Sequence, residues 1–311
     1  MHFIAVLNKD SGTFRTLDMA AFTATAERIF LDAGHTIECR VVEGRNLFRE
    51  LGRAAQDPAS DVLLAGGGDG TISAAAGICF KQKMPLAVLP AGTMNLFARS
   101  LKVPLNLDQA LRALAEGELH RVDIATANGR PFVHQFAVGM HSRLVRIRNA
   151  LTYNSRIGKM LASVRAAGAT LSRPLVFDVE IRTPNGIENR RATAISISNN
   201  LLGEGHVPYA EQVDQGVLGV YVFKPMPPLE LAKLAFSLLL GTWKHHPLVS
   251  ERQVQEVTLN FRRLKATAKA VIDGELVDLE KRVELKMHRG ALQVIVPKVD
   301  APATPKLPEA A

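Results

Sequence analysis

The chain has 311 residues, of which 47% are hydrophobic, 22% charged and 5% aromatic, and its formal net charge is +8 from 38 Lys and Arg against 30 Asp and Glu. At roughly 150 residues per domain this length suits two cores, and the composition excludes a peptide hormone, a collagen and a disordered chain. The basic balance favours an anionic partner, which could equally be a nucleotide, a nucleic acid or a membrane surface.

The cysteine content and the N-terminus indicate a cytoplasmic protein. Cys39 and Cys79 have no CxxC spacing and are too few for a disulfide framework, which favours a reducing compartment. The N-terminus has no basic segment before its short apolar run, so no signal peptide is predicted. The longest later apolar stretch, 229–243, contains Glu230 and Lys233 and is shorter than the ~20 residues that a membrane span needs.

The first third of the chain alternates short apolar runs with helical periodicity. Strands are predicted at 2–8, 36–43, 61–66 and 85–90, and helices at 17–33, 46–56, 72–80, 94–101 and 107–116. This alternation is typical of a parallel sheet covered on both faces, so we expect a doubly wound α/β domain over 1–124.

The pattern after residue 120 changes to short strands separated by turn residues, with helical pieces at 142–171 and 228–242. The strands are predicted at 121–128, 131–139, 175–183, 189–200, 217–223, 256–261, 266–275, 283–290 and 291–297. Their spacing predicts a mostly antiparallel β-sandwich domain over 125–297. The proline-rich residues 298–311 are expected to be a disordered tail.

The sharpest local motif is GGGDGT at 66–71, between a predicted strand and a predicted helix. Successive glycines allow positive φ and close approach to a ligand, and the start of the helix favours phosphate. Asp69 would repel a bare phosphate, a conflict that a magnesium-bound triphosphate resolves. The alternative is a plain glycine turn in which Asp69 and Thr71 are helix caps. The motif matches neither GxxxxGK[ST] nor GxGxxG.

Two further turns follow predicted parallel strands. The turn PAGT, 90–93, brings Thr93 and Asn95 to the carboxyl edge of the sheet, and NKDSGT, 8–13, brings Asn8 to the same edge. Ligands of doubly wound sheets bind at this edge, so hydroxyl and amide groups from both turns are candidates for contacts with a nucleotide.

These motifs together resemble the diacylglycerol kinase catalytic-domain family, which includes soluble bacterial lipid kinases and sphingosine kinases and is distantly similar to NAD kinases. The resemblance rests on NKDSG, GGGDGT, GTMN with LFARSL, and IDGE at 272–275, in this order. It extends over roughly 1–297 and implies an α/β nucleotide domain and a β-sandwich with the active site in the cleft between them.

The resemblance also implies roles for particular residues. The nucleotide would lie on Asn8, Gly66, Gly67, Gly68, Asp69, Gly70, Thr71, Gly92, Thr93 and Asn95. Asp273 and Glu275 would form the catalytic acidic pair, with Asp273 as the general base. The metal ligands would be Asp69 and, for a structural magnesium held in some bacterial members, Asp214.

Two positions depart from the family pattern. Leu96 stands where many bacterial diacylglycerol kinases have Asp after GTxN, and Gln215 stands where the second Asp of an Asp-Asp pair is expected. Both changes remove a carboxylate from the magnesium network.

The chemistry of Asp273 can also be argued from the residue itself. Phosphoryl transfer needs aligned phosphates, a cation and a carboxylate that accepts the hydroxyl proton, and an Asp of pKa ~3.9 is ionised at neutral pH. Asp273-Gly274 between two apolar runs is equally a hairpin turn signal, and a tight turn can also present a carboxylate rigidly.

The basic charge is concentrated in the middle of the chain, where no acidic residue occurs between Asp123 and Asp178. Such a segment favours an anionic bilayer, although a solvated helix is an equal alternative. The segment 226–243 could be a lipid-facing amphipathic helix or a core helix. Without a nucleic-acid motif, and with three Tyr and one Trp, no nucleic-acid partner is expected.

The sequence therefore predicts an ATP- and Mg²⁺-dependent lipid kinase acting on a hydroxyl of diacylglycerol or a related membrane lipid. It would be cytoplasmic, peripheral to the inner face of the membrane, and a homodimer is compatible with the sequence. The alternatives are an NAD kinase-like enzyme with a soluble substrate and a non-catalytic nucleotide- or lipid-binding protein.

Overall fold

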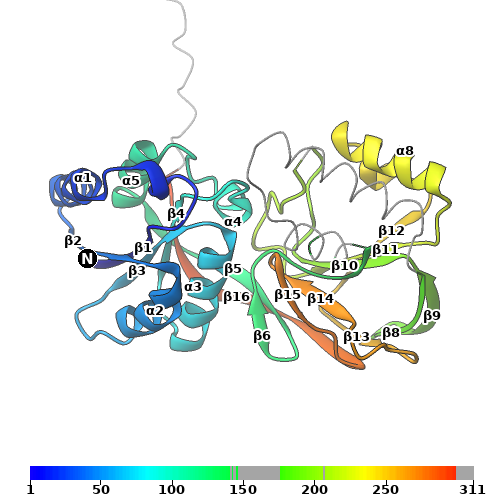
Figure 1. Ribbon diagram of the computed structural model, residues 1–311. Helices are drawn as coiled ribbons and strands as arrows, with labels where there is room; N and C mark the ends of the chain where they lie inside the picture. The colour runs from blue at the N-terminus through cyan, green and yellow to red at the C-terminus, as the bar shows by residue number, and fades with distance from the viewer. Residues whose placement is uncertain (141, 143–144, 146–175, 206, 299–311) are drawn as a thin grey trace, which may run out of the picture.

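The N-terminal half is a parallel four-stranded unit covered by helices. The computed structural model describes residues 1–140, 142, 145, 176–205 and 207–298 (Figure 1). The parallel strands lie in the order β2-β1-β3-β4 and comprise β1 (His2–Asn8), β2 (Thr36–Val42), β3 (Val62–Gly67) and β4 (Leu86–Pro90). Every residue of β3 and β4 is buried, as expected for parallel strands with both faces covered.

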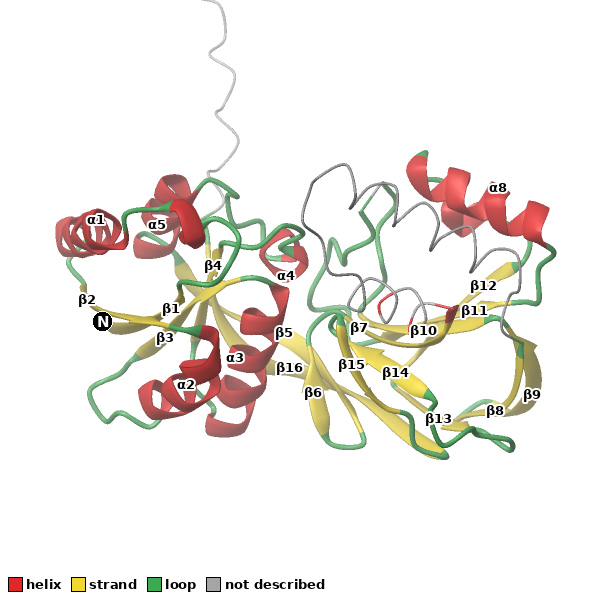
Figure 2. Cartoon of the chain, viewed as in Figure 1, coloured by secondary structure: helices red, strands yellow, loops and turns green. Residues whose placement is uncertain are grey.

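The helices of this half lie on both faces of the sheet, α1 with α5 on one side and α2 with α3 on the other (Figure 2). They are α1 (Met19–Asp32), α2 (Leu47–Ala55), α3 (Asp69–Gln82), α4 (Leu96–Ser100) and α5 (Leu107–Ala115), with 3-10 turns at Phe14–Thr16 and Gly44–Asn46. The Asp18 carboxylate accepts the N–H groups of Ala20 and Ala21 and thereby fixes the start of α1. The predicted doubly wound α/β fold is confirmed.

The C-terminal half is a β-sandwich. Its second sheet has six strands in the order β12-β11-β10-β7-β14-β15, and its inner residues share one apolar core with β5, β8, β13 and β16 of the first sheet. The strands are β5 (Glu118–Ala127), β6 (Arg130–Phe132), β7 (Gln135–Gly139), β8 (Phe177–Thr183), β9 (Gly186–Ala192), β10 (Ala194–Asn199), β11 (Leu218–Phe223), β12 (Val249–Val254), β13 (Glu256–Asn260), β14 (Lys269–Ile272), β15 (Glu275–Asp278) and β16 (Arg282–Val296). The predicted antiparallel sandwich is therefore confirmed.

One strand joins the two halves into a continuous sheet of ten strands. The strands predicted at 283–290 and 291–297 are a single strand, β16, whose register shifts between His288 and Leu292. Val294 pairs in parallel with Leu86 of β4, whereas the earlier part of β16 pairs antiparallel with β13. The domain limits of 1–124 and 125–297 remain predictions, but the end of β16 packs in the first core.

The helix α8 (Pro228–Leu239) covers the outer face of the six-stranded sheet, followed by a 3-10 turn at Trp243–His245. It buries Leu231 and Leu234 in a small cluster with Tyr221 and Trp243, which supports the core-helix alternative for one of its faces. Among the described residues no helix has the length and apolar character needed to cross a bilayer. Apart from Ser142 and Val145, the predicted helix at 142–171 lies outside the described residues, as does the predicted tail at 298–311 except for Lys298.

Candidate active site

The two glycine turns that follow β3 and β4 lie against each other. A Cβ added to Gly92 would come within 2.6 Å of the Gly68 Cα, so glycine is required for the turns to approach this closely. The first turn leads directly into α3, with Gly68 as the N-cap residue. The N–H groups in the first turn of α3 have no intrahelical acceptor and form an anion-binding end.

The glycines of GGGDGT are needed for close packing and not for positive φ angles. This corrects the expectation from the sequence that these glycines would adopt positive φ. None of Gly66, Gly67, Gly68 and Gly70 has a positive φ, and the first two belong to β3. A Cβ on Gly66 would lie 2.6 Å from a methyl group of Leu7. The helix also begins at Asp69, three residues earlier than predicted.

Asp69 holds the second turn in place. Its carboxylate accepts the N–H of Asn95 at 3.1 Å through Oδ2 and that of Leu96 at 2.6 Å through Oδ1. These two bonds fix the start of α4, so Asp69 has a structural role that requires no cation. A carboxylate has about four acceptor positions, which leaves Asp69 able to contact a cation carried by a nucleotide.

Asn95 closes the second turn, whereas Thr93 remains available to a ligand. Asn95 is buried with φ of 51°, its Oδ1 accepts the N–H of Gly92, and its Nδ2 donates to the Gly92 carbonyl. Its amide is therefore engaged within the turn, and the predicted contact with a nucleotide stays a prediction. Thr93 is exposed, and in the described part of the chain its hydroxyl has no hydrogen-bond partner.

The loop after β1 contacts the GGGDGT turn, as its position at the sheet edge predicted. Asn8 Nδ2 donates to the buried hydroxyl of Thr71 at 3.2 Å. The Gly68 N–H donates to Ser11 Oγ at 3.3 Å. The hydrogen bond between Asn8 and Thr71 thus stabilises the GGGDGT turn.

Asp273 lies at the end of β14 and is the most strongly engaged carboxylate of the site. Its side chain accepts the Ser73 hydroxyl at 2.7 Å and the backbone N–H groups of Val133, His134 and Gln135 at 2.9, 3.0 and 2.9 Å. The residue is 7% exposed and has φ of 46°, which the turn Asp273-Gly274 imposes. Burial raises the pKa of Asp273, against the four donors that favour its ionised form.

Glu275, the first residue of β15, lies across from the start of α3. Its Oε2 accepts a hydrogen bond from Arg130 Nη2 at 2.7 Å, and its Oε1 is 3.6 Å from the position of a Cβ on Gly70. The acidic hairpin of the sandwich therefore faces the first turn of α3. Ser73 is four residues beyond Asp69, so Asp273 meets α3 about 6 Å along the helix from that turn.

The second metal position differs from the expectation. Asp214 is exposed, and Gln215 uses Oε1 to accept the Leu201 N–H at 3.1 Å and Nε2 to donate to Gln212 at 3.0 Å. The described residues contain no group of three His, Cys, Asp or Glu placed to hold a metal ion. A structural metal on Asp214 therefore does not fit this loop, in which an amide takes the place of a carboxylate.

Sequence reasoning missed two residues. Ser73, which joins α3 to Asp273, lies on the same helix face as Gly70 and Gly77, a small-residue spacing that could have indicated a close contact. Asp123 is fully buried, and its carboxylate accepts the N–H groups of Gly216 and Gly290. No local pattern marks Asp123, because both partners are distant in sequence.

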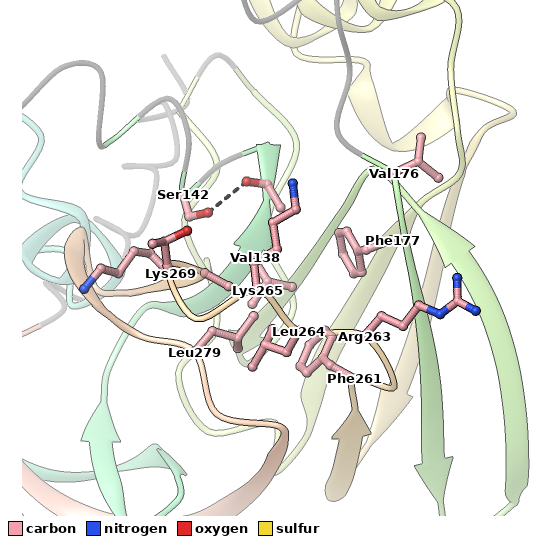
Figure 3. A pocket seen from close by; sticks show the side chains of 13 residues that line it. Val138, Ser142, Val176, Phe177, Phe261, Arg263, Leu264, Lys265, Lys269 and Leu279 are labelled. Atoms are coloured by element: carbon pink, nitrogen blue, oxygen red, sulfur yellow. Dashed lines mark hydrogen bonds between the residues drawn. The ribbon is translucent and has the colours of Figure 1, made fainter.

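An apolar pocket of about 350 Å³ opens at the end of the sandwich away from Asp273. Val138, Phe177, Phe261, Leu264 and Leu279 supply its apolar side chains, and the guanidinium of Arg263 points away from them (Figure 3). The pocket is lined by the end of β7 and the start of β14, whereas Asp273 follows the end of β14 and accepts a hydrogen bond from Gln135 at the start of β7.

The fold is an α/β fold whose glycine turns lie at the carboxyl ends of parallel strands, the edge at which doubly wound sheets bind their ligands. Residues 2–127 match the sequence profile of the diacylglycerol kinase catalytic domain. This region is therefore similar to the catalytic domain of that kinase family, and the resemblance drawn from the motifs is confirmed.

Curated relatives and a solved structure show the same similarity to diacylglycerol kinases. The diacylglycerol kinase of Staphylococcus saprophyticus is 26% identical over 241 residues, which cover 72% of this chain and 76% of that protein. That of Staphylococcus aureus strain JH9 is 27% identical over 243 residues, covering 72% and 74%. A diacylglycerol kinase structure from Bacillus anthracis str. Sterne superposes with a TM-score of 0.70 at 19% identity, covering 95% of this chain and 96% of that one.

Proposed function

We propose that this protein is an ATP- and Mg²⁺-dependent lipid kinase that transfers the γ-phosphate of ATP to a hydroxyl of diacylglycerol or a related membrane lipid. The observation that carries the proposal is the position of Asp273. It is a buried carboxylate on the sandwich that hydrogen bonds to Ser73 of α3, about one helical turn beyond Asp69.

The nucleotide side of the reaction relies on the backbone. The first turn of α3 supplies N–H groups to the phosphates, and the close packing of Gly68 against Gly92 holds the second glycine turn beside it. Thr93 offers an exposed hydroxyl beside the same turn. Mg²⁺ bound with ATP would neutralise charge that develops on the transferred phosphoryl group, and Asp69 and Glu275 are the residues that would hold it.

The acceptor side relies on Asp273 and Ser73. All four acceptor positions of the Asp273 carboxylate are occupied, three of them by backbone N–H groups that cannot leave without moving the chain. Only the Ser73 hydroxyl can rotate away, and Ser73 is partly exposed. A substrate hydroxyl would take the place of Ser73 on Asp273 Oδ2 and pass its proton there as its oxygen bonds to the γ-phosphorus, while the bond from that phosphorus to the bridging oxygen breaks and ADP leaves.

The apolar pocket supports a lipid substrate over a soluble one. Asp273 lies four positions beyond Lys269, which lines the pocket, and in an extended strand this is a span of roughly 13 Å. A lipid with its hydroxyl at Asp273 would have to cross this span for an acyl chain to enter the pocket. The apolar part of the lining, with Val138, Phe177 and Phe261, suits a hydrocarbon chain.

The test is a transfer assay with ATP labelled at the γ-phosphate, Mg²⁺ and three separate acceptors: vesicles with diacylglycerol, vesicles with ceramide, and NAD in solution. We expect label in the lipid fraction and none on NAD. Label on NAD alone would refute the lipid kinase in favour of the soluble-substrate alternative. ATP binding without transfer to any acceptor would instead support the non-catalytic alternative.

One observation favours that second candidate, a protein that binds nucleotide or lipid without transfer. Leu96 and Gln215 both stand in place of carboxylates, and Gln215 stabilises its loop through an amide hydrogen bond that needs no metal. A chain that has replaced its metal ligands with such bonds can keep its fold after losing activity. The labelled-ATP assay distinguishes the two proposals directly.

A further inference from the structure

The loop between β13 and β14 combines free positive charge with the mouth of the apolar pocket. Residues 261–272 contain four basic residues and no acidic one. Arg263 and Lys265 are exposed, line the pocket, and have no ion-pair partner in the part of the chain that is described. We call Arg262 to Thr267 the basic loop.

The charges of the basic loop contrast with those on the neighbouring strands. Arg182 and Arg190 are each paired with a carboxylate at 2.5 and 2.6 Å, and Arg252 is paired with Glu188. At the two ends of the loop, Arg262 and Lys269 also have carboxylate partners. Within residues 261–272, Arg263 and Lys265 are therefore the two cations without an ion-pair partner among the described residues, and both line the pocket, which leaves a net positive mouth above an apolar interior.

This arrangement matches the surface of an anionic bilayer, where phosphate groups overlie hydrocarbon chains. Phe261 and Leu264 direct the same loop onto the sandwich core, so the backbone of the loop is anchored while its cations face outward (Figure 3). A basic surface that binds nucleic acid would carry aromatic groups for base stacking on its exposed side, whereas the aromatic rings here, Phe177 and Phe261, lie inside the pocket.

We propose that the basic loop is the membrane-contacting surface of the protein, in which Arg263 and Lys265 bind the headgroups of anionic lipids and the pocket between them receives an acyl chain. The proposal rests on the proposed function only for the identity of the chain that enters the pocket. Contact with an anionic bilayer at this loop does not depend on phosphoryl transfer.

The experiment measures sedimentation of the full chain with vesicles, without ATP, at physiological salt. One set of vesicles is phosphatidylcholine, and the other is equal parts phosphatidylcholine and phosphatidylglycerol. The double variant Arg263→Gln with Lys265→Gln removes two charges worth ~1 kcal/mol each near such a surface, so its binding to anionic vesicles should fall about 30-fold. The matched control, Arg28→Gln with Lys81→Gln, removes two exposed charges from the α/β half and should bind like the parent protein.

Several results would overturn the proposal. Equal loss of binding in the control pair would mean that net charge, and not this loop, governs the contact. Unchanged binding of the Arg263 and Lys265 variant would place the contact elsewhere. Binding of poly(U) RNA as tight as that of anionic vesicles, lost in the same variant, would identify a nucleic-acid surface instead.

A parallel assay separates this proposal from the proposed function. The parent protein should transfer phosphate to diacylglycerol in neutral detergent micelles, which present no anionic surface, so this assay reports phosphoryl transfer separately from contact with an anionic bilayer. Transfer in micelles together with unchanged vesicle binding by the variant would refute the proposed membrane contact of the basic loop and would support the proposed kinase activity. If no transfer occurs in any system and the variant loses vesicle binding, the proposed kinase activity is refuted and the membrane contact of the basic loop is supported.

Discussion

The replacement Asp273→Asn tests the candidate site most directly, because Asn keeps the shape of the side chain and tolerates the φ of 46° at this position. An amide has one acceptor oxygen where the carboxylate has two, so two of the four donors lose their acceptor. The Ser73 hydroxyl can turn to accept from the new NH₂ group, whereas one buried backbone N–H, that of Val133, cannot. An unpaired buried N–H costs about 1–3 kcal/mol, which is the expected loss of unfolding free energy.

The effect on activity should be far larger than the effect on stability. Removing a general base typically slows transfer 10²–10⁴-fold, while ATP binding, which relies on the turns before α3 and α4, should change little. The assay compares initial rates of lipid phosphorylation, ATP affinity by calorimetry and unfolding by urea on the same preparations. Activity of Asp273→Asn within threefold of the parent protein, ~0.65 kcal/mol in the barrier, would refute the role of Asp273 as the base.

The pH dependence of the transfer rate gives a second test of the role of Asp273 as the base. Burial raises the folded-state pKa of Asp273, so the rate should rise with pH through that raised pKa as the base ionises, and Asp273→Asn should lack this rise. Ser73→Ala removes one donor to the carboxylate and should move the rise to higher pH. The free energy of unfolding depends on pH in the opposite direction to the transfer rate. The contribution of Asp273 to it is fully present below the unfolded-state pKa and is lost as pH rises through the folded-state pKa.

Two further predictions concern the turns and the thiols. Gly92→Ala should destabilise the fold by about 1–3 kcal/mol and weaken ATP binding, because its Cβ would meet Gly68 at 2.6 Å, whereas Gly52→Ala in α2, where nothing lies within 4 Å, should stabilise it by about 0.5–1 kcal/mol. Urea unfolding and ATP titration of both variants check this, and equal effects would contradict it. Burial raises the pKa of Cys39 and Cys79 to about 12, so Ellman's reagent at pH 8 should label neither within minutes and both in urea. Fast labelling of the native protein would contradict that.

The sequence predicted the elements of the α/β half well, because local periodicity and turn residues determine them. The strands preceding GGGDGT and PAGT lie within one residue of the predicted limits. The interpretation of the glycines was wrong in one respect, since spacing along the chain cannot show that Gly68 and Gly92 pack against each other. Likewise, the amide side chain of Asn95 is of a type that often contacts ligands. Only the folded turn shows that this amide is already hydrogen bonded to the backbone of Gly92.

The sandwich was less predictable, because its pairing is between distant segments. The sequence around Gly290 indicated two strands, and the structure has one, since the residue adopts φ of 57° within a bulge that keeps β16 continuous. The strand β12 was missed because VSERQV has too few apolar residues to show a period of two. Ser73 was missed for a related reason: its partner Asp273 lies 200 positions away.

The continuous sheet explains how an α/β domain and a sandwich can present one site. Both β5 and β16 contribute to two cores: Val122 and Leu292 pack in the first, whereas Ala127 and Leu285 pack in the second. At their crossing, Asp123 accepts the N–H of Gly290 in β16, which fastens the bulge to β5. The GGGDGT turn and Asp273 belong to different sheets, so their separation depends on the continuous ten-stranded sheet, on the packing of the six-stranded sheet against it, and on the hydrogen bond between Ser73 and Asp273. Reorientation of the two halves would have to bend the sheet at this bulge, because elsewhere along β16 it would break the paired strands on both sides.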